Sequence, residues 1–130
     1  MNKKIVIAGL LGALGVGLGA FGAHGLKPLI LESQLTIYRT AVNYQMLHVV
    51  VLLAIALFSQ HYSHKLLNRA FWAITIGIFL FSGSLYLLST KDILGIVNWK
   101  WLGPMTPLGG LSFIVGWLLI MVYGLRQKQE

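Results

Sequence analysis

The sequence contains no cysteine, only three acidic residues, and no charged residue at all in four long stretches. The absence of cysteine excludes disulfides, thiolate metal sites and membrane thiol-redox chemistry. The uncharged stretches are residues 5–23, 41–59, 70–90 and 103–125. A charge at the centre of a bilayer costs at least about 2.5–3.5 kcal/mol, so a chain that crosses lipid keeps charges out of its spans. The sequence therefore predicts an integral membrane protein.

The composition leaves room for little besides these spans. Of the 130 residues, 57% are hydrophobic and 10% are charged, whereas soluble domains carry about 25% charged residues. A hydrocarbon core about 30 Å thick needs roughly 20 helical residues per crossing. We therefore expect an all-α fold, a bundle of four transmembrane helices, that forms a single membrane domain over residues 1–130.

The net charge of +7 does not indicate a nucleic-acid partner. The basic residues are spread over short regions that flank the spans, and they do not gather on one face. In those positions they can meet anionic lipid headgroups. The expected partner is the lipid bilayer, and no nucleic acid is expected.

The flanking charges also bear on orientation. With four spans, both termini and the loop after residue 59 share one side, which carries Lys3, Lys4, Lys65, Arg69, Arg126 and Lys128. The other side carries Lys27, Arg39, Lys91 and Lys100. This excess of basic residues favours cytoplasmic termini. The apolar run after Lys4 is longer than the roughly 7–15 residues of a signal peptide, so we expect an uncleaved first span.

Glycine is concentrated in the first and last spans. In the first, Gly12, Gly15 and Gly19 are separated by about one helical turn, and in the last Gly109, Gly110 and Gly116 form a second small face. Such faces let helices approach closely in lipid. We expect them to pack helices within the bundle or between subunits, which makes a homo-oligomer or a subunit of a membrane complex the expected assembly. General glycine enrichment of membrane helices is the alternative.

The connection after the first span contains helix-ending residues. Gly25 is expected to form a left-handed cap, and Pro28 blocks continuation of the helix. Ser33 is the expected N-cap of the next helix. We expect that helix to start at the membrane interface and to continue without a break to about residue 59.

Polar residues cluster where the predicted topology brings four helix ends to the outer membrane face. This candidate cluster contains His24, Arg39, Tyr44, His48, Ser82, Ser84, Tyr86 and Thr106. Tyr44 and His48 are four residues apart and share one helical face. His48 lies well inside an apolar run, where it needs a hydrogen-bond partner.

Several chemistries compete for this cluster. His24 and His48 could ligate a haem or a metal, but they have no characteristic spacing and no carboxylate to complete a site. Tyr44 and His48 could bind a quinone or a lipid headgroup. A network of interhelical hydrogen bonds, each worth about 0.6–2 kcal/mol, is favoured over both. We expect no catalytic residue, metal or cofactor, and a non-enzymatic protein is favoured over an enzyme.

Four segments of the chain are similar to one family. They are LGAFGAHGL at residues 18–26, TAVNYQMLH at 40–48, FSGSLY at 81–86, and PMTPLGG at 104–110 with Gly116–Trp117. In this order they resemble the family catalogued as domain of unknown function 423, which includes the eukaryotic transmembrane protein 256. The resemblance implies a four-helix protein of the cytoplasmic (inner) membrane with no established activity. Its motifs contain seven residues of the candidate cluster, namely His24, Tyr44, His48, Ser82, Ser84, Tyr86 and Thr106.

Two main functional hypotheses follow. The first is a non-enzymatic helix-packing protein that acts as a homo-oligomer or an accessory subunit. The second is a binder or transporter of a small molecule, lipid or quinone that uses the polar cluster. Small four-helix exporters usually rely on a carboxylate in the first helix, and residues 5–23 contain none. A haem- or quinone-linked enzyme is the third alternative.

Overall fold

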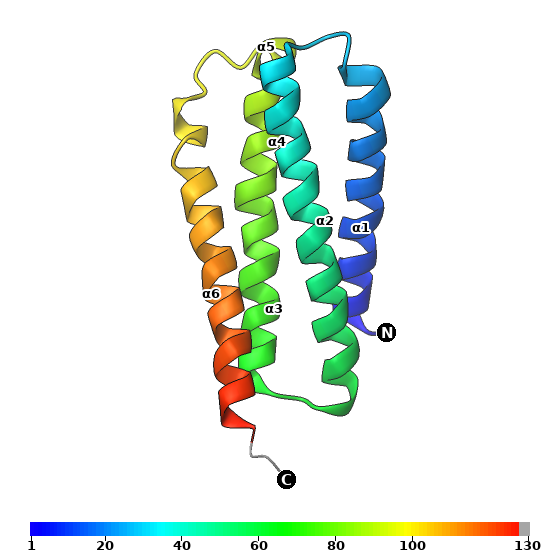
Figure 1. Cartoon of the computed structure of the whole chain (residues 1–130), viewed down its shortest axis with the longest axis vertical. Coiled ribbons are helices and arrows are strands. Elements are labelled where there is room, and N and C mark those ends of the chain that lie inside the picture. Colours follow the sequence, from blue (N-terminus) through cyan, green and yellow to red (C-terminus); the bar gives the residue numbers. More distant parts are fainter. Residues whose placement is uncertain (128–130) are drawn as a thin grey trace.

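A computed structural model of the chain describes residues 1–127 and consists of long helices that run alternately up and down (Figure 1). Lys128, which was counted in the charge comparison, lies outside the described residues. The long α-helices are α1 (Lys3–Phe21), α2 (Glu32–His61), α3 (Lys65–Gly77) and α6 (Met105–Arg126). The shorter elements are the π turns η1 (Gly22–Leu26) and η2 (Ile78–Ser82), the helices α4 (Gly83–Ser89) and α5 (Lys91–Leu94), and the 3-10 turn η3 (Lys100–Leu102).

Within residues 1–127, four helical units are long and apolar enough to cross a membrane. They are Lys3–Leu26, Glu32–His61, Lys65–Ser89 and Lys100–Arg126. Three of them contain a predicted span in full, and Lys65–Ser89 ends one residue before the predicted end at residue 90. At about 1.5 Å per residue, the shortest unit of 24 residues is about 36 Å long and exceeds a hydrocarbon core of about 30 Å. The predicted all-α fold with four membrane-spanning helices is confirmed.

The helix ends differ from the sequence-based expectation at two places. Gly25 is not a left-handed cap, because α1 continues into η1, and Gly95 is the one glycine with positive φ in residues 1–127. Ser33 is not an N-cap either, because α2 already begins at Glu32. The side-chain oxygen of Gln34 accepts the backbone N–H of Leu31 at 3.0 Å and so completes this end without Ser33.

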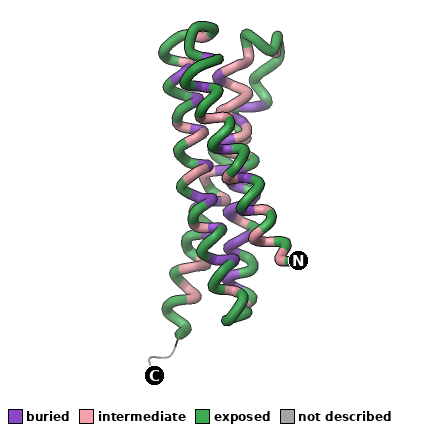
Figure 2. Tube along the Cα trace, turned by 90° about the vertical axis from the view of Figure 1, so that its right-hand side faces the viewer, coloured by how far each residue is buried: buried purple, intermediate pink, exposed green. Residues whose placement is uncertain are grey.

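The helices lie in chain order from one edge of the bundle to the other. α1 packs against α2, α2 packs against the α3–η2–α4 unit, and α6 packs against α3. Within the described residues, α1 and α6 make no backbone contact with each other. The most apolar windows of the two central units are 39% buried, against 22% for the first unit and 17% for the last. Figure 2 shows the result, with buried residues inside and exposed residues covering the outer faces.

The π turn η2 divides the third unit into two parts with different partners. α3 packs mainly against α6, whereas α4 packs mainly against α2. A π turn accommodates one extra residue in a helix, so it shifts by one position which residues after it face a given direction. The residues of α3 that face α6 are followed, beyond η2, by residues of α4 that face α2.

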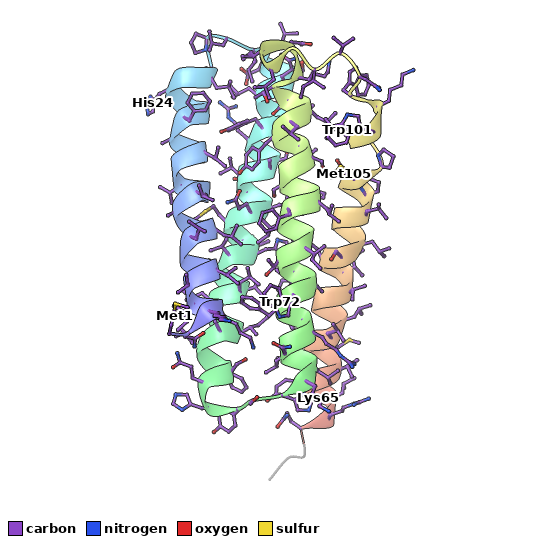
Figure 3. The ribbon with its side chains drawn as sticks, turned by 180° about the vertical axis from the view of Figure 1, so that it is seen from behind. Met1, His24, Lys65, Trp72, Trp101 and Met105 are labelled. Atoms are coloured by element: carbon purple, nitrogen blue, oxygen red, sulfur yellow. The ribbon has the colours of Figure 1, made fainter. Side chains whose placement is uncertain are left out.

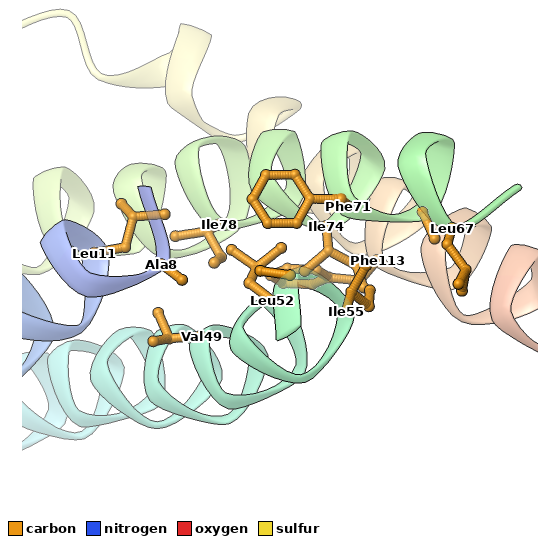
Figure 4. Packing of buried hydrophobic residues seen from close by; sticks show 12 residues of the cluster. Ala8, Leu11, Val49, Leu52, Ile55, Leu67, Phe71, Ile74, Ile78 and Phe113 are labelled. Atoms are coloured by element: carbon orange, nitrogen blue, oxygen red, sulfur yellow. The ribbon is translucent and has the colours of Figure 1, made fainter. Parts of the chain in front are cut away.

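The apolar core lies where α2, α3 and α6 meet. Leu52, Phe71 and Ile74 are fully buried in it, and Phe113 of α6 closes one side (Figure 4). α1 contributes the small side chain of Ala8 together with Leu11. The core thus holds α2 and α3 together. Most of the buried polar contacts between helices lie in the half of the bundle that contains η2 and α4.

Candidate functional site

Gln45 is the most deeply buried amide of the bundle and connects three helices. It is 3% exposed on α2. Its side-chain nitrogen donates to the carbonyl oxygen of Leu11 on α1 at 2.8 Å, and its side-chain oxygen accepts the hydroxyl of Tyr86 on α4 at 2.7 Å. Because the Leu11 carbonyl can only accept and the Gln45 oxygen has a hydroxyl donor, the network fixes the orientation of the amide.

Tyr38 extends this network toward the end of the bundle that carries η1 and α5. Its hydroxyl donates to the carbonyl oxygen of Leu18 on α1 at 2.6 Å, and its ring meets that of Tyr86 edge to face at 5.2 Å. A Cβ at Gly22 would collide with the Tyr38 ring, so the absence of a side chain there lets the ring reach α1. Tyr38, Gln45 and Tyr86 together hold α1, α2 and α4, and we call them the Gln45 network.

His48 lies one α2 turn from Gln45 but belongs to a different contact. It is 3% exposed and stacks on the ring of Phe113, with the centroids 3.7 Å apart. The indole N–H of Trp117 donates to its Nε2 at 3.2 Å, and its Nδ1 lies 2.7 Å from the carbonyl oxygen of Tyr44. Since the indole can only donate, Nε2 is the acceptor and Nδ1 carries the proton. Both nitrogens of the imidazole are therefore engaged by the protein.

Hydroxyl groups make the remaining interhelical bonds. Ser82 in η2 donates to the carbonyl oxygen of Ala41 on α2 at 2.8 Å. Ser84 on α4 and Thr106 on α6 lie 2.6 Å apart, oxygen to oxygen. Ser112 on α6 donates to the carbonyl oxygen of Ala73 on α3 at 2.6 Å. Each pair of adjacent helices in this half is therefore joined by at least one polar contact.

Three residues of the candidate cluster lie away from these contacts. His24 is exposed on η1, at the edge of the bundle (Figure 3). Arg39 is exposed as well and pairs with Glu32 of its own helix at 3.2 Å. The Tyr44 side chain is 42% exposed, and its ring lies against Phe81 with the centroids 4.5 Å apart. The structure thus separates the candidate cluster into several small groups and does not bring His24 and His48 into one site.

The six glycines singled out in the sequence lie at contacts between helices. A Cβ at Gly12 or Gly19 would come within 3.3 Å of a valine methyl on α2, and one at Gly15 would collide with Met46. On α6, a Cβ at Gly109 would collide with the backbone of Phe81 in η2, and one at Gly116 with the side chain of Ile74. Gly110 is less crowded, at 3.8 Å from the Phe81 ring.

The bundle offers little for a metal or a polar ligand in this half. In residues 1–127 no group of three or more His, Cys, Asp or Glu side chains could hold a metal ion. A cavity of about 240 Å³ opens between α1, α2, α4 and α5, at the end of the bundle that carries η1, and its lining is almost entirely apolar. Tyr38 and Tyr86 are among its lining residues, while their hydroxyls are bound within the Gln45 network.

The candidate cluster predicted from the sequence did not include Tyr38, Gln45, Ser112 and Trp117. A signal for two of them is present in α2, where apolar or large side chains recur at alternating steps of three and four residues, namely Leu35, Tyr38, Val42, Gln45, Val49 and Leu52. Residues with this period face one partner helix continuously. Trp117 and Ser112 have no comparable signal, because α6 is apolar on all sides.

Comparisons with known proteins give a consistent match along the chain. Residues 18–110 match the family described as "Protein of unknown function (DUF423)". The UPF0382 membrane protein YwdK of Bacillus subtilis is 41% identical over 95% of this chain and 98% of its own length. The UPF0382 membrane protein SH2409 of Staphylococcus haemolyticus is 40% identical over 94% of each chain, and a UPF0382 membrane protein of Haemophilus influenzae is 35% identical over 98% of this chain and 97% of its own. No solved structure matches the chain at a significant level.

Proposed function

The chain belongs to the DUF423 family, whose function is unknown, and we propose that it is a non-enzymatic membrane protein that assembles with a second copy of itself. An accessory role in a larger membrane complex is the closely related form of the same proposal. The observation that carries it is the contrast between polar side chains already bonded inside the bundle and outer helix faces that contact nothing within it.

The polar side chains support a structural role because their hydrogen-bonding groups are used. The Gln45 amide, the Tyr86 hydroxyl and both nitrogens of His48 have protein partners. Catalysis needs a group that can exchange its partner for a substrate or a proton. Breaking any of these bonds in lipid would leave a polar group without a substitute. Side chains bonded in this way hold the helices in register.

The outer face of α1 supports assembly. Gly9, Ala13 and Gly17 recur every four residues on its exposed side, and a Cβ at either glycine would have no atom within 4 Å. This stripe is distinct from the one made by Gly12, Gly15 and Gly19, which faces α2. Small residues at this spacing let two membrane helices approach closely. α1 therefore has one small face for α2 and a second one free for a partner.

The test uses the absence of cysteine from the chain. Ala13→Cys places a single thiol in the outward stripe, and Ile114→Cys is the matched control on the exposed face of α6. After oxidation in native membranes, we expect a disulfide-linked dimer for Ala13→Cys and much less for the control. A protein that purifies in mild detergent as a lone monomer, with no cross-link at Ala13, would contradict the proposal.

We also propose a cytoplasmic-membrane location with both termini in the cytoplasm. The family names of the relatives support a membrane protein, and the basic residues favour this orientation. Lys3, Lys4, Lys65, Arg69 and Arg126 lie at one end of the described bundle, where α1 begins and α6 ends. Basic residues close to span ends stay preferentially on the cytoplasmic side.

Binding of an apolar small molecule is a second candidate, favoured by the cavity of about 240 Å³ at the outer end. Its apolar lining suits a lipid chain or the tail of a quinone better than a polar headgroup. Mass spectrometry of an organic extract of the purified protein tests it. A quinone or a lipid enriched over bulk membrane would support binding, and bulk lipid composition alone would speak against it.

A further inference from the structure

The end of the bundle where α1 begins and α2 turns into α3 holds a hollow lined by basic and hydrogen-bonding side chains. Its volume is about 280 Å³, and we call it the basic pocket. Its lining includes Lys4, Ser59, His64, Lys65, Asn68 and Arg69. A neighbouring hollow of about 530 Å³ shares Lys4 and Ser59 with it and adds Lys3. The two hollows together form one concave surface at this end.

The positive charge of the basic pocket has no counter-charge in the described part of the chain. In residues 1–127 the only carboxylates are Glu32 and Asp92, and both lie at the opposite end of the bundle. They already have cationic neighbours there, with Glu32 3.2 Å from Arg39 and Asp92 3.5 Å from Lys91. The three positively charged side chains of Lys4, Lys65 and Arg69 line a concave surface and attract an anion. The low-dielectric bundle behind them strengthens that attraction.

Ser59 adds a hydroxyl group that lacks a partner. Its oxygen is buried, and it is the one buried side-chain polar atom in residues 1–127 without a hydrogen bond. A buried hydroxyl left unpaired costs about 1–3 kcal/mol, so native proteins rarely leave one without a function or a bound group. Since Ser59 lines both hollows, a ligand there could accept its hydrogen.

Two local features favour an anion with several acceptor oxygens. The first turn of α3 begins at Lys65, so the positive end of a 13-residue helix points toward the pocket. The Lys4 ammonium is held over the ring of Phe71, 5.6 Å from its centroid, which keeps this charge close to the bundle. Arg and Lys side chains bind phosphate oxygens through charge-assisted hydrogen bonds.

The ordinary role of flanking basic residues in topology explains only part of this arrangement. An excess of Lys and Arg on one side requires neither a concave surface nor a buried hydroxyl. We propose that the basic pocket binds a phosphate group, carried by an anionic lipid headgroup or by a soluble phosphate compound. This inference does not depend on the proposed self-assembly.

The experiment uses the full chain purified in mild detergent, with two probes. Native mass spectrometry counts adducts of dioleoyl phosphatidylglycerol against dioleoyl phosphatidylcholine, and thermal unfolding is followed with inorganic phosphate against chloride at equal ionic strength. We expect preferential binding of at least one phosphate probe. Binding of the anionic lipid alone identifies a headgroup, and stabilisation by inorganic phosphate as well identifies a soluble source.

Matched charge variants decide whether the pocket is the site. The pair Lys65→Gln and Arg69→Gln is compared with Lys27→Gln and Lys100→Gln, which remove the same charge from exposed positions at the other end. We expect about a tenfold loss of affinity, equal to about 1.4 kcal/mol, for the first pair only. Equal losses for the two pairs, or no binding of either probe, would overturn the proposal.

Ser59→Ala separates ligand binding from folding. Because no protein group bonds the hydroxyl, its removal should leave the unfolding temperature without ligand unchanged or slightly raised. Affinity for the phosphate probe should fall several-fold. Unchanged affinity, with the free protein as stable as the parent, would mean that the hydroxyl faces no ligand and would overturn the pocket as argued.

Discussion

The hydroxyl group of Tyr86 donates a hydrogen bond of 2.7 Å to the side-chain oxygen of Gln45, which joins α4 to α2 inside the bundle. The same amide reaches the backbone of α1 at Leu11. A bond of this kind is worth about 0.6–2 kcal/mol in a membrane. The energy is small, but the contact also sets geometry. One side chain fixes the positions of three helices relative to one another along the bundle axis.

Gln45 and Tyr86 should be energetically coupled. Gln45→Met keeps the length of the side chain but leaves the Tyr86 hydroxyl unpaired, and we expect a loss of about 1–3 kcal/mol in the free energy of unfolding. Tyr86→Phe should cost about 0.5–1.5 kcal/mol for the same reason. The double variant should lose less than the sum, because no polar partner is left behind. Unfolding in mixed detergent micelles measures all three.

Tyr44→Phe provides the control for this cycle, because Tyr44 lies on the same helix and is 42% exposed. It should change the free energy of unfolding by less than about 0.5 kcal/mol. Strict additivity of Gln45→Met and Tyr86→Phe would mean that the two side chains do not interact.

The tautomer of His48 gives a second prediction. The Trp117 indole donates to Nε2. Nitrogen NMR of the neutral His48 imidazole should therefore show Nδ1 protonated and Nε2 unprotonated. Trp117→Phe removes the donor and should shift the Nε2 resonance of His48, while the exposed His24 serves as an internal reference. A protonated Nε2 in the parent protein would exclude the Trp117 bond.

Three glycines on α6 should respond differently to a single added methyl group. Gly109→Ala brings a Cβ against the backbone of Phe81, which cannot rotate away, so we expect a loss of about 1–3 kcal/mol. Gly116→Ala should cost less, because the obstructing atoms belong to the side chain of Ile74. Gly124→Ala meets no atom within 4 Å and should be neutral or gain up to about 1 kcal/mol from helix propensity. Thermal unfolding of the three variants tests the order, and equal effects would contradict it.

The proposed orientation predicts which thiols an impermeant reagent can reach. Single cysteines introduced at Ser63 and at Asn98 lie in exposed connections at opposite ends of the bundle. In intact cells the reagent should label Asn98→Cys and spare Ser63→Cys, and broken membranes should allow labelling of both. Labelling of Ser63→Cys alone in intact cells would reverse the orientation.

The sequence was sufficient for the number and approximate position of the spans, because lipid penalises charge so strongly that the boundaries follow from the charged residues alone. It was not sufficient for the helix ends. Gly25 was expected to stop α1, but in lipid the unpaired carbonyl groups of a helix end favour continuation, and the chain uses the wider turn η1.

The polar contacts were predictable only in part. His48 was recognised as needing a partner, but nothing in the sequence distinguished Trp117 from the other aromatic residues of an apolar helix. His24 was grouped with His48 because both lie toward the same membrane face, although they point in different directions. Depth in the membrane can be read from residue number, whereas the angular position around each helix depends on neighbours that the sequence does not specify.

The π turn η2 makes the spacing between the two halves of the third unit depend on a single residue. One residue advances a regular α-helix by about 100°, so closing η2 into α-helical turns without removing a residue would turn the serine and tyrosine faces of α4 away from α2. The unit would keep its length and hydropathy and still cross the bilayer. Deleting one residue between Ile78 and Ser82 would instead restore a regular helix with α4 still facing α2, so this short segment absorbs the loss of one residue without a change of pairing between helices.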